Sequence, residues 1–336
     1  MVTRIDESRF DVDGAGDPEG SVFGLPYGED ESSVVLVPVP WEPTTSYGAG
    51  AAKGPEAIRQ ASKQLDLYDA ELAEIGLARP WVFGLHMQRA DEAIEAWNRE
   101  ACAAARAEQR DVARVDALSW LMAERVEGRV GAVLDAGKIA GVVGGDHSVV
   151  YGSIAAASKR GSIGVLHVDA HADLRVDYEG FAHSHASVMH GVLRDFAGVE
   201  KLVQIGIRDL SAAEAVFIRE EPRVHTVLDH QVRGGGPWPI DMLPARVWIS
   251  FDIDGLDPAL CPGTGTPVPG GLGFGQAMSL LRAVAESGRT IVGFDLVEVA
   301  PSPFHGEWDG NVGARILYRL CGAALYSQGA RDELRS

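Results

Sequence analysis

The sequence predicts an α/β protein, a three-layer α/β/α sandwich around a mostly parallel sheet. Short, β-branched runs that are apolar along almost their whole length alternate with helical patterns over most of the 336 residues. Strands of this kind are typical of a parallel sheet that is covered by helices on both faces. No internal repeat and no linker rich in Pro and Ser divides the chain, so we expect one domain over residues 33–330.

The individual elements follow from the same patterns. The expected strands are residues 34–39, 140–143, 163–168, 202–207, 224–228, 247–253 and 291–297. The expected helices are residues 55–67, 90–127, 149–158, 276–286 and 311–324. Residues 1–32 are rich in Asp, Glu and Gly and have no periodicity, which indicates a flexible or extended N-terminal arm.

Composition excludes several classes of protein. The chain has 30 Lys and Arg against 48 Asp and Glu, a net charge of −18, which disfavours a nucleic-acid partner. It contains no apolar run close to the roughly 20 residues that span a bilayer, so we expect no membrane association. Its three cysteines, Cys102, Cys261 and Cys321, are far apart and do not form a CxxC pair. Together with a start that does not resemble a secretory signal, this predicts a cytoplasmic location.

Four of the expected strands end in His or carboxylate residues. The segments concerned are residues 144–148, 169–173, 252–254 and 295–298. In open α/β sheets, ligands bind beyond the carboxyl ends of the strands. We therefore expect these four segments to meet at one edge of the sheet.

The spacing of these residues indicates a metal site. Side chains alternate along an extended backbone, so Asp252 and Asp254 point the same way, as do Asp169, His171 and Asp173. Several carboxylates are costly to bury together unless cations neutralise them. Two imidazoles and four carboxylates suit Mn, Fe, Co, Ni or Zn better than Ca, and six ligands suit two ions better than one. The predicted ligands are His147, Asp169, His171, Asp173, Asp252 and Asp254.

Two residues next to these motifs are expected to have roles other than metal binding. An Asp after a strand is more often a helix cap than a ligand, and we expect Asp146 to cap the helix that begins near Val149. His167 is expected on the face opposite the metal motif, as a buried and hydrogen-bonded core residue. The conjunction of three motifs is far more specific than any one of them.

The three motifs resemble the signatures of the ureohydrolases, a family that includes arginase, agmatinase, guanidino-acid hydrolases and formimidoylglutamase. They are residues 144–148, 169–173 and 250–258, supported by residues 47–50, 262–267 and 295–298. The resemblance covers residues 34–328 and implies a three-layer fold. It also implies a binuclear site, usually manganese, that hydrolyses a guanidino or amidino carbon.

By the same resemblance, each of the two divalent ions has four ligands. One ion would be held by His147, Asp169, Asp173 and Asp252. The other would be held by Asp169, His171, Asp252 and Asp254, so that Asp169 and Asp252 bridge. Relatives are usually trimers or hexamers, which implies a homo-oligomer.

The resemblance also implies two catalytic residues. Glu298 would pair with the guanidinium group and orient it, a contact that is planar and bidentate in favourable geometry. His185 occupies the position of the family's proton-shuttling His, because residues 184–187 look like its Ser-His-Gly-Thr loop. His183 is the alternative, since it lies two residues away.

The substrate is less strongly indicated. Arg175 and Phe181 stand where arginase-like sites present Asn and Ser, so agmatine, hydrolysed to putrescine and urea, is the first expectation. If Arg175 faces the pocket as a substrate-binding residue, it favours a carboxylate tail, as in 4-guanidinobutyrate, 3-guanidinopropionate or formimidoylglutamate. In the other interpretation Arg175 pairs with Asp177 or Glu179. Guanidine is a further alternative.

Two other questions remain open at this stage. A zinc deacetylase of the same fold is the alternative from a different class, although the six ligands argue against it. The stretch at residues 90–127 is longer than short family members have before Gly144. It would cover the pocket mouth, form an oligomer contact, or be a surface helix pair without a catalytic role.

Overall fold

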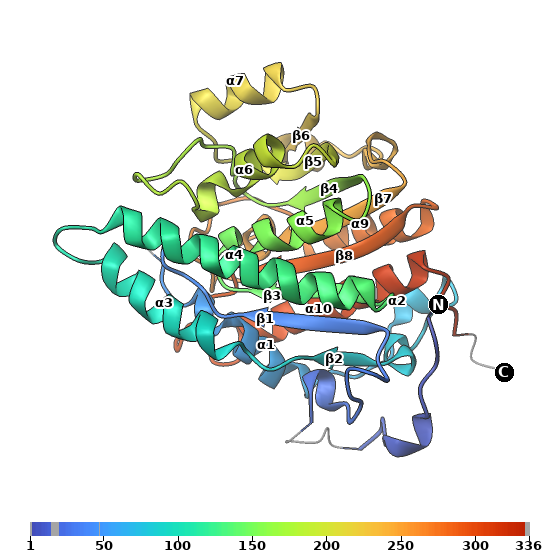
Figure 1. Ribbon diagram of the computed structural model, residues 1–336. Helices are drawn as coiled ribbons and strands as arrows, with labels where there is room; N and C mark the ends of the chain where they lie inside the picture. Colours follow the sequence, from blue (N-terminus) through green and yellow to red (C-terminus); the bar gives the residue numbers. More distant parts are fainter. Residues whose placement is uncertain (1, 15–19, 47, 333–336) are drawn as a thin grey trace.

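A parallel sheet lies at the centre of the protein, with helices on both of its faces (Figure 1). The computed structural model describes residues 2–14, 20–46 and 48–332, and its sheet has eight strands in the order β2-β1-β3-β8-β7-β4-β5-β6. Every neighbouring pair of strands is parallel. The predicted fold class is therefore confirmed.

All seven predicted strands are present, and one strand was missed. The strands are β1 (Val34–Val39), β2 (Leu85–Met87), β3 (Ile139–Gly144), β4 (Ile163–Val168), β5 (Val199–Ile207), β6 (Val224–Leu228), β7 (Arg246–Asp252) and β8 (Thr290–Val297). The missed strand, β2, has three residues and pairs with β1 at the edge of the sheet. A strand of that length leaves almost no periodic signal in a sequence.

The helices divide into two layers, each over its own hydrophobic cluster. On one face lie α1 (Gly54–Ser62), α9 (Phe274–Glu286) and α10 (Trp308–Ser327), and on the other lie α3 (Glu92–Ala105), α4 (Val112–Asp135), α5 (Val150–Ser158) and α6 (Val188–Asp195) (Figure 1). The other α-helices of the described chain are α2 (Ala70–Ala73), α7 (Ala212–Glu220) and α8 (Asp229–Arg233). In the described part of the chain, no helix is long and apolar enough to cross a membrane.

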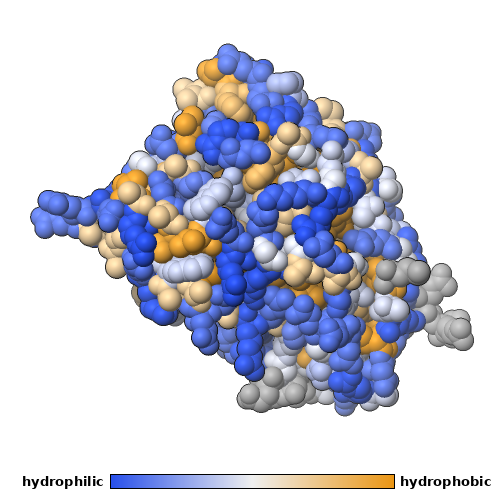
Figure 2. Space-filling model, viewed as in Figure 1, coloured by the Kyte–Doolittle hydropathy of each residue, from blue (hydrophilic) through white to orange (hydrophobic). Residues whose placement is uncertain are grey.

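The surface agrees with this layered arrangement. The face seen in Figure 2 is mostly hydrophilic, and its apolar residues form small, separate areas. The outer sides of α3, α4 and α6 contribute much of this face (Figures 1 and 2). Apolar side chains of these helices instead fill the interior cluster.

The region predicted as one helix over residues 90–127 is a hairpin of two helices. The side chain of Asp91 accepts hydrogen bonds from the amides of Ala93 and Ile94 and so caps α3. The side chain of Asp111 accepts from the amide of Arg114 and begins α4, which then continues to Asp135. The helical pattern predicted over residues 90–127 is therefore interrupted at the capping residue Asp111, and of the alternatives for this stretch the structure contains the pair of helices.

The described parts of residues 1–32 lie against the edge of the sheet. Val22, Phe23 and Leu25 are buried in the main core cluster. The amide of Ile5 donates to the carbonyl of Val82, and the amide of Met87 in β2 donates to Ser21. The division of the chain into an N-terminal arm and a catalytic domain stays a prediction. The contacts above join the described part of the arm to the edge of the sheet.

The four polar strand ends lie side by side. Strands β3, β8, β7 and β4 are consecutive in the sheet and parallel, so their carboxyl ends are at the same edge. Asp252 is the last residue of β7, and the segments that follow β3, β8 and β4 contain His147, Glu298 and Asp169, respectively. The fold therefore brings the predicted site residues to one place.

Candidate metal centre and substrate cavity

The imidazole of His147 is surrounded by carboxylates from two other strands. Its Nδ1 lies 3.0 Å from an oxygen of Asp169, 3.1 Å from Asp173 and 3.3 Å from Asp252. The same Nδ1 is buried and makes no hydrogen bond to any described residue. An imidazole nitrogen without a hydrogen bond, facing three carboxylates, has the donor set and the orientation that a divalent ion requires.

A second group of ligands adjoins the first. Nδ1 of His171 lies 3.1 Å from Asp254 and 3.5 Å from Asp169. Asp169 belongs to both groups of clustered His and Asp residues. Two ligand groups that share a carboxylate suggest a binuclear divalent metal site. The structure thus brings together all six residues of the predicted ligand set.

Burial makes this cluster electrostatically unfavourable without cations. Asp252 and Asp254 are each 3 % exposed, and Asp169 is 1 % exposed. Burial, and then the negative charges of Asp254 and Asp169, raise the pKa of Asp252 well above its usual range. A divalent ion would remove this penalty and keep the carboxylates ionised. The residues therefore fit a metal centre.

Glu298 lies beside the cluster at the end of β8. It is 5 % exposed, adopts a positive φ of 63°, and its Oε1 accepts a hydrogen bond of 2.9 Å from the amide of His147. Burial and the neighbouring carboxylate of Asp146 raise the pKa of Glu298 well above its usual range. A cationic group next to Glu298 would restore its charge, which is a suitable environment for a guanidinium ion.

Asp146 has the capping role predicted for it. Its Oδ1 accepts a hydrogen bond of 3.1 Å from the amide of Ser148, and it caps the 3-10 turn at His147–Val149 that leads into α5. Its Oδ2 accepts from the hydroxyl of Thr44. Asp146 therefore fixes the loop on which His147 stands.

His167 is only partly as predicted. It is fully buried and hydrogen-bonded, but it lies on the same side as the metal motif, with Nε2 2.8 Å from Oδ2 of Asp169. Gln204 donates to its Nδ1, which leaves the proton on Nε2 to be donated to Asp169. The expectation of the opposite face is wrong because residues two apart in an extended strand share a face.

A cavity of about 400 Å³ opens onto the cluster. The ligands His171 and Asp173 form part of its wall, so a molecule in the cavity would reach the metal centre. Other residues that line it are Ser46, Arg175, Tyr178, His185, Asp209 and Glu214. This is the cavity that we take as the substrate site.

Of the two candidate shuttle residues, His185 is the one that lines the cavity. Its Nδ1 is 3.3 Å from the hydroxyl of Thr44, and its Nε2 is 3.3 Å from that of Ser46. Burial lowers the pKa of His185 to about 3, so the ring is neutral at neutral pH. The ring of His183 lies outside the cavity, 5.3 Å from that of Trp120.

Arg175 also lines the cavity, and its partners differ from those expected. Its guanidinium stands 5.3 Å from the ring centre of Tyr178, and its Nε is 3.9 Å from Glu214. Glu179 instead pairs with Arg110, and the described salt bridges of Arg175 do not include Asp177. The alternative pairing with Asp177 or Glu179 is therefore wrong.

Glu214 is the cavity residue that the sequence interpretation missed. It stands in α7, where its carboxylate accepts a hydrogen bond from the amide of Ser211. In return, Oγ of Ser211 accepts a hydrogen bond from the amide of Glu214. The other carboxylate oxygen of Glu214 accepts from the amide of Leu174, next to the ligand Asp173. The Ser-x-x-Glu pattern of a capping box was the signal that would have located both α7 and this carboxylate.

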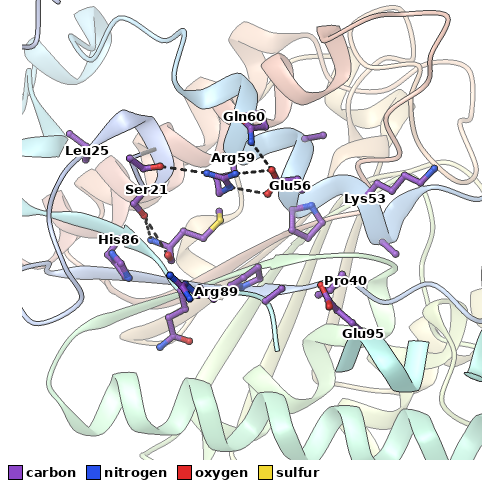
Figure 3. A pocket seen from close by; sticks show the side chains of 18 of the residues that line it. Ser21, Leu25, Pro40, Lys53, Glu56, Arg59, Gln60, His86, Arg89 and Glu95 are labelled. Carbon is purple, nitrogen blue, oxygen red and sulfur yellow. Dashed lines mark hydrogen bonds and ion pairs between the residues drawn. The ribbon is translucent and has the colours of Figure 1, made fainter. Parts of the chain in front are cut away.

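A larger cavity lies elsewhere in the described part of the chain. It measures about 1290 Å³ and is lined by residues near the ends of β1 and β2, among them Ser21, Lys53, Glu56 and His86 (Figure 3). Arg59 and Gln60 both donate to Glu56 there (Figure 3). Among the described residues that line this cavity, none belongs to the predicted ligand set. The larger of these two cavities is therefore not the one that adjoins the predicted metal ligands.

Known proteins are similar to this chain in sequence and in fold. The model of the arginase family matches residues 32–322. The chain is 36% identical over 310 residues to the N(1)-aminopropylagmatine ureohydrolase of Thermus thermophilus, covering 90% of this chain and 94% of that protein. It is 30% identical over 312 residues to the agmatinase of Neisseria meningitidis, covering 92% and 91%, respectively. The crystal structure of the agmatine ureohydrolase of Thermoplasma volcanium matches with a TM-score of 0.70 and 27% identity, covering 96% of this chain and 99% of that one.

With this fold, this cluster and these matches, the chain belongs to the arginase family, whose members are ureohydrolases that hydrolyse guanidino C–N bonds. Within the family it is an agmatinase-like ureohydrolase.

Proposed function

We propose that this enzyme uses two manganese ions to hydrolyse a linear guanidino compound with a cationic amine tail, and that agmatine is its first substrate. The products from agmatine would be putrescine and urea. The observation that carries the proposal is the cluster of the six predicted ligands, two of which, His171 and Asp173, form part of the wall of the 400 Å³ cavity. No other described cavity combines clustered ligands with neighbouring titratable residues.

The ligands divide naturally between two ions. His147 with Asp173 would hold one ion, His171 with Asp254 would hold the other, and Asp169 and Asp252 would bridge. The distances support Asp169 as a bridge, because it lies near both His147 and His171, and Asp252 lies 3.3 Å from His147. Two such ions would lower the pKa of a water molecule and so supply hydroxide at neutral pH.

Two further residues would act on the substrate. Glu298 would bind the guanidinium and orient its carbon toward the cluster, supported by its burial beside His147. His185 would take up on its neutral ring the proton that the attacking water releases and pass it to the departing amine, supported by its position in the cavity wall. A guanidinium is a poor electrophile, so orientation and proton transfer would both contribute to the rate.

Arg175 would contact the tail of the substrate rather than its guanidinium. Its charge is partly offset by Glu214, and Asp209 adds a second carboxylate to the cavity wall. A wall with these two acids favours a cationic tail over a carboxylate tail. The relatives named for N(1)-aminopropylagmatine point in the same direction, so this longer polyamine is the second candidate substrate.

The test is a substrate panel on manganese-loaded protein. Urea release would be measured with agmatine, N(1)-aminopropylagmatine, 4-guanidinobutyrate, 3-guanidinopropionate, arginine and guanidine, and release of formamide or ammonia with formimidoylglutamate. We expect the highest kcat/KM with one of the first two compounds. A preference for a guanidino acid would overturn the cationic tail, and no turnover of any compound would overturn the enzymatic function.

We also propose a cytoplasmic homo-oligomer, a trimer or hexamer as the family resemblance implies. Free thiols at Cys102, Cys261 and Cys321 agree with a reducing compartment. Light scattering coupled to size-exclusion chromatography would test the assembly, and a monomer at micromolar concentration would contradict it.

A further inference from the structure

The loop that forms one wall of the cavity is held from outside by the α3–α4 hairpin. This wall loop, residues 175–187, presents Arg175, Tyr178 and His185 to the cavity. The residues between them, from Glu179 to His183, face the hairpin. Cavity-lining residues and hairpin-contacting residues thus belong to the same short stretch of chain.

Three kinds of contact join the hairpin to the wall loop. The carboxylate of Asp116 in α4 accepts hydrogen bonds of 3.1 Å from the amide of Ala182 and 3.3 Å from that of His183. The guanidinium of Arg110 is 2.5 Å from the carboxylate of Glu179. Phe181 is 3 % exposed and lies in a small apolar cluster with Ala105 and Val115, one residue from each helix.

A tight turn in the wall loop links the residues that contact the hairpin to Tyr178. The backbones of Tyr178 and Phe181 exchange hydrogen bonds of 3.1 and 2.9 Å, with Glu179 and Gly180 between them at positive φ of 52° and 91°. Such two-residue turns have a fixed geometry. When the hairpin fixes Glu179 and Phe181, it therefore also fixes Tyr178, whose ring lies 5.4 Å from that of His185.

The hairpin also holds the second loop that touches His185. Asn98 in α3 accepts a hydrogen bond of 2.8 Å from the amide of Glu42, and Glu42 in turn accepts from the amides of Gly50 and Ala52. Thr44 and Ser46 lie between these anchors, and both contact the ring of His185. Both loops around His185 are thus tied to the same pair of helices.

We propose that the α3–α4 hairpin is a positioning element for the substrate cavity, and that Asp116 is its principal positioning residue. The charged Asp116 carboxylate accepts from two backbone amides of the wall loop, and such charge-assisted hydrogen bonds are stronger than neutral ones. Its loss leaves the wall loop free to shift, and small shifts of groups around a substrate reduce the rate strongly. The proposal rests on the proposed function only in taking this cavity as the substrate site.

The experiment compares Asp116→Ala with Asp116→Asn and a control in metal-loaded, full-length protein. In Asp116→Ala, we expect faster amide hydrogen exchange at Ala182 and His183, because both amides lose their acceptor, and a fall of about tenfold in kcat/KM from the displaced wall loop, with unchanged metal content. Asp116→Asn keeps an acceptor oxygen and should recover most of both properties. Asp135→Ala is the matched control, because Asp135 is also in α4 and binds Arg160 far from the wall loop.

Charge reversal keeps the proposal testable if Asp116→Ala does not fold. Arg110 and Glu179 are 49% and 41% exposed, so exchanging their charges leaves the core intact. We expect Arg110→Glu to lower kcat/KM about threefold, and Glu179→Arg in the same chain to restore it. Unchanged kcat/KM in Asp116→Ala or in Arg110→Glu, or equal losses in Asp135→Ala, would overturn the positioning role. A wild-type protein inactive on every guanidino substrate would instead overturn the proposed function.

Discussion

The hydroxyl of Ser250 lies 2.9 Å from Nε2 of His147 and donates a hydrogen bond of 2.9 Å to the buried carboxylate of Asp295. Because the hydroxyl proton is directed to Asp295, its oxygen accepts from Nε2–H of His147. The proton of the imidazole is thereby placed on Nε2, and the lone pair of Nδ1 faces Asp169, Asp173 and Asp252. Partners of this kind orient metal ligands and fix their tautomer.

Ser250→Ala should therefore weaken metal binding. We expect the apparent affinity for manganese to fall about 10- to 100-fold, because His147 loses the group that fixes its tautomer and its ring orientation. Titration with manganese, followed by activity and by bound metal, measures this change. Ser153→Ala is the matched control, since Ser153 is equally buried and its hydroxyl donates only to the carbonyl of Val150. Equal affinity in the two variants would show that Ser250 has no such role.

Glu298→Gln should separate substrate binding from metal binding. The amide keeps an acceptor for the hydrogen bond from His147 but removes the charge that pairs with a guanidinium. We expect kcat/KM to fall about 10²-fold or more, with two ions still bound. Steady-state kinetics and elemental analysis of the same sample measure both quantities, with Glu307→Gln as an exposed control. Full activity in Glu298→Gln would refute the assignment.

Gly145→Ala should destabilise the protein through the loop of His147. A Cβ on Gly145 would lie 1.8 Å from the carbonyl oxygen of Trp41, a clash with backbone that cannot move aside easily. We expect the free energy of unfolding to fall by about 3 kcal/mol or more. For the control Gly275→Ala in α9, no described atom lies within 4 Å, and stability should be unchanged or slightly higher. Urea denaturation of the two variants provides the comparison, and similar midpoints would contradict it.

Asp91→Ala should destabilise the hairpin in a pH-dependent way. Burial raises the pKa of Asp91, but the hydrogen bond from Arg125 and the amides of α3 outweigh it and lower the pKa below its usual range. Because the folded-state pKa is depressed, the stabilisation is fully present above about pH 4, the usual pKa of Asp, and is lost as the pH falls through the folded-state value. We expect a loss of about 1 kcal/mol at pH 7 that shrinks below pH 4. A difference between variant and wild type that stays constant down to pH 2.5 would contradict this.

Much of the fold was predictable because its strands are buried on both faces and leave continuous apolar runs. Asp252 and Asp254 do lie in one cluster as predicted, but not through alternation along a strand, because β7 ends at Asp252 and a 3-10 turn at Ile253–Gly255 brings Asp254 to the same place. The face predicted for His167 was wrong because residues two apart in extended backbone share a face, and His167 is two residues before Asp169 at the end of β4. The break between α3 and α4 and the carboxylate of Glu214 depend on capping residues, whose signal is a single Asp or a Ser-x-x-Glu pattern.

The contacts between distant segments had no local signal. Asp116 and Ala182 are 66 residues apart, and their hydrogen bond follows from where the α3–α4 hairpin packs on the sheet. The same is true of the partner of Arg175, because Glu214 reaches it from a helix that follows another strand. Sequence patterns predict the faces of elements, whereas such contacts depend on how the elements are packed in three dimensions.

The most direct test of the metal centre is a crystal structure of manganese-loaded protein with anomalous scattering measured at the manganese edge. Two peaks are expected, about 3.5–4 Å apart, one beside Nδ1 of His147 and the other beside Nδ1 of His171, with Asp169 and Asp252 in contact with both. A single peak, or two peaks that do not share these carboxylates, would contradict the binuclear centre on which the proposed hydrolysis depends.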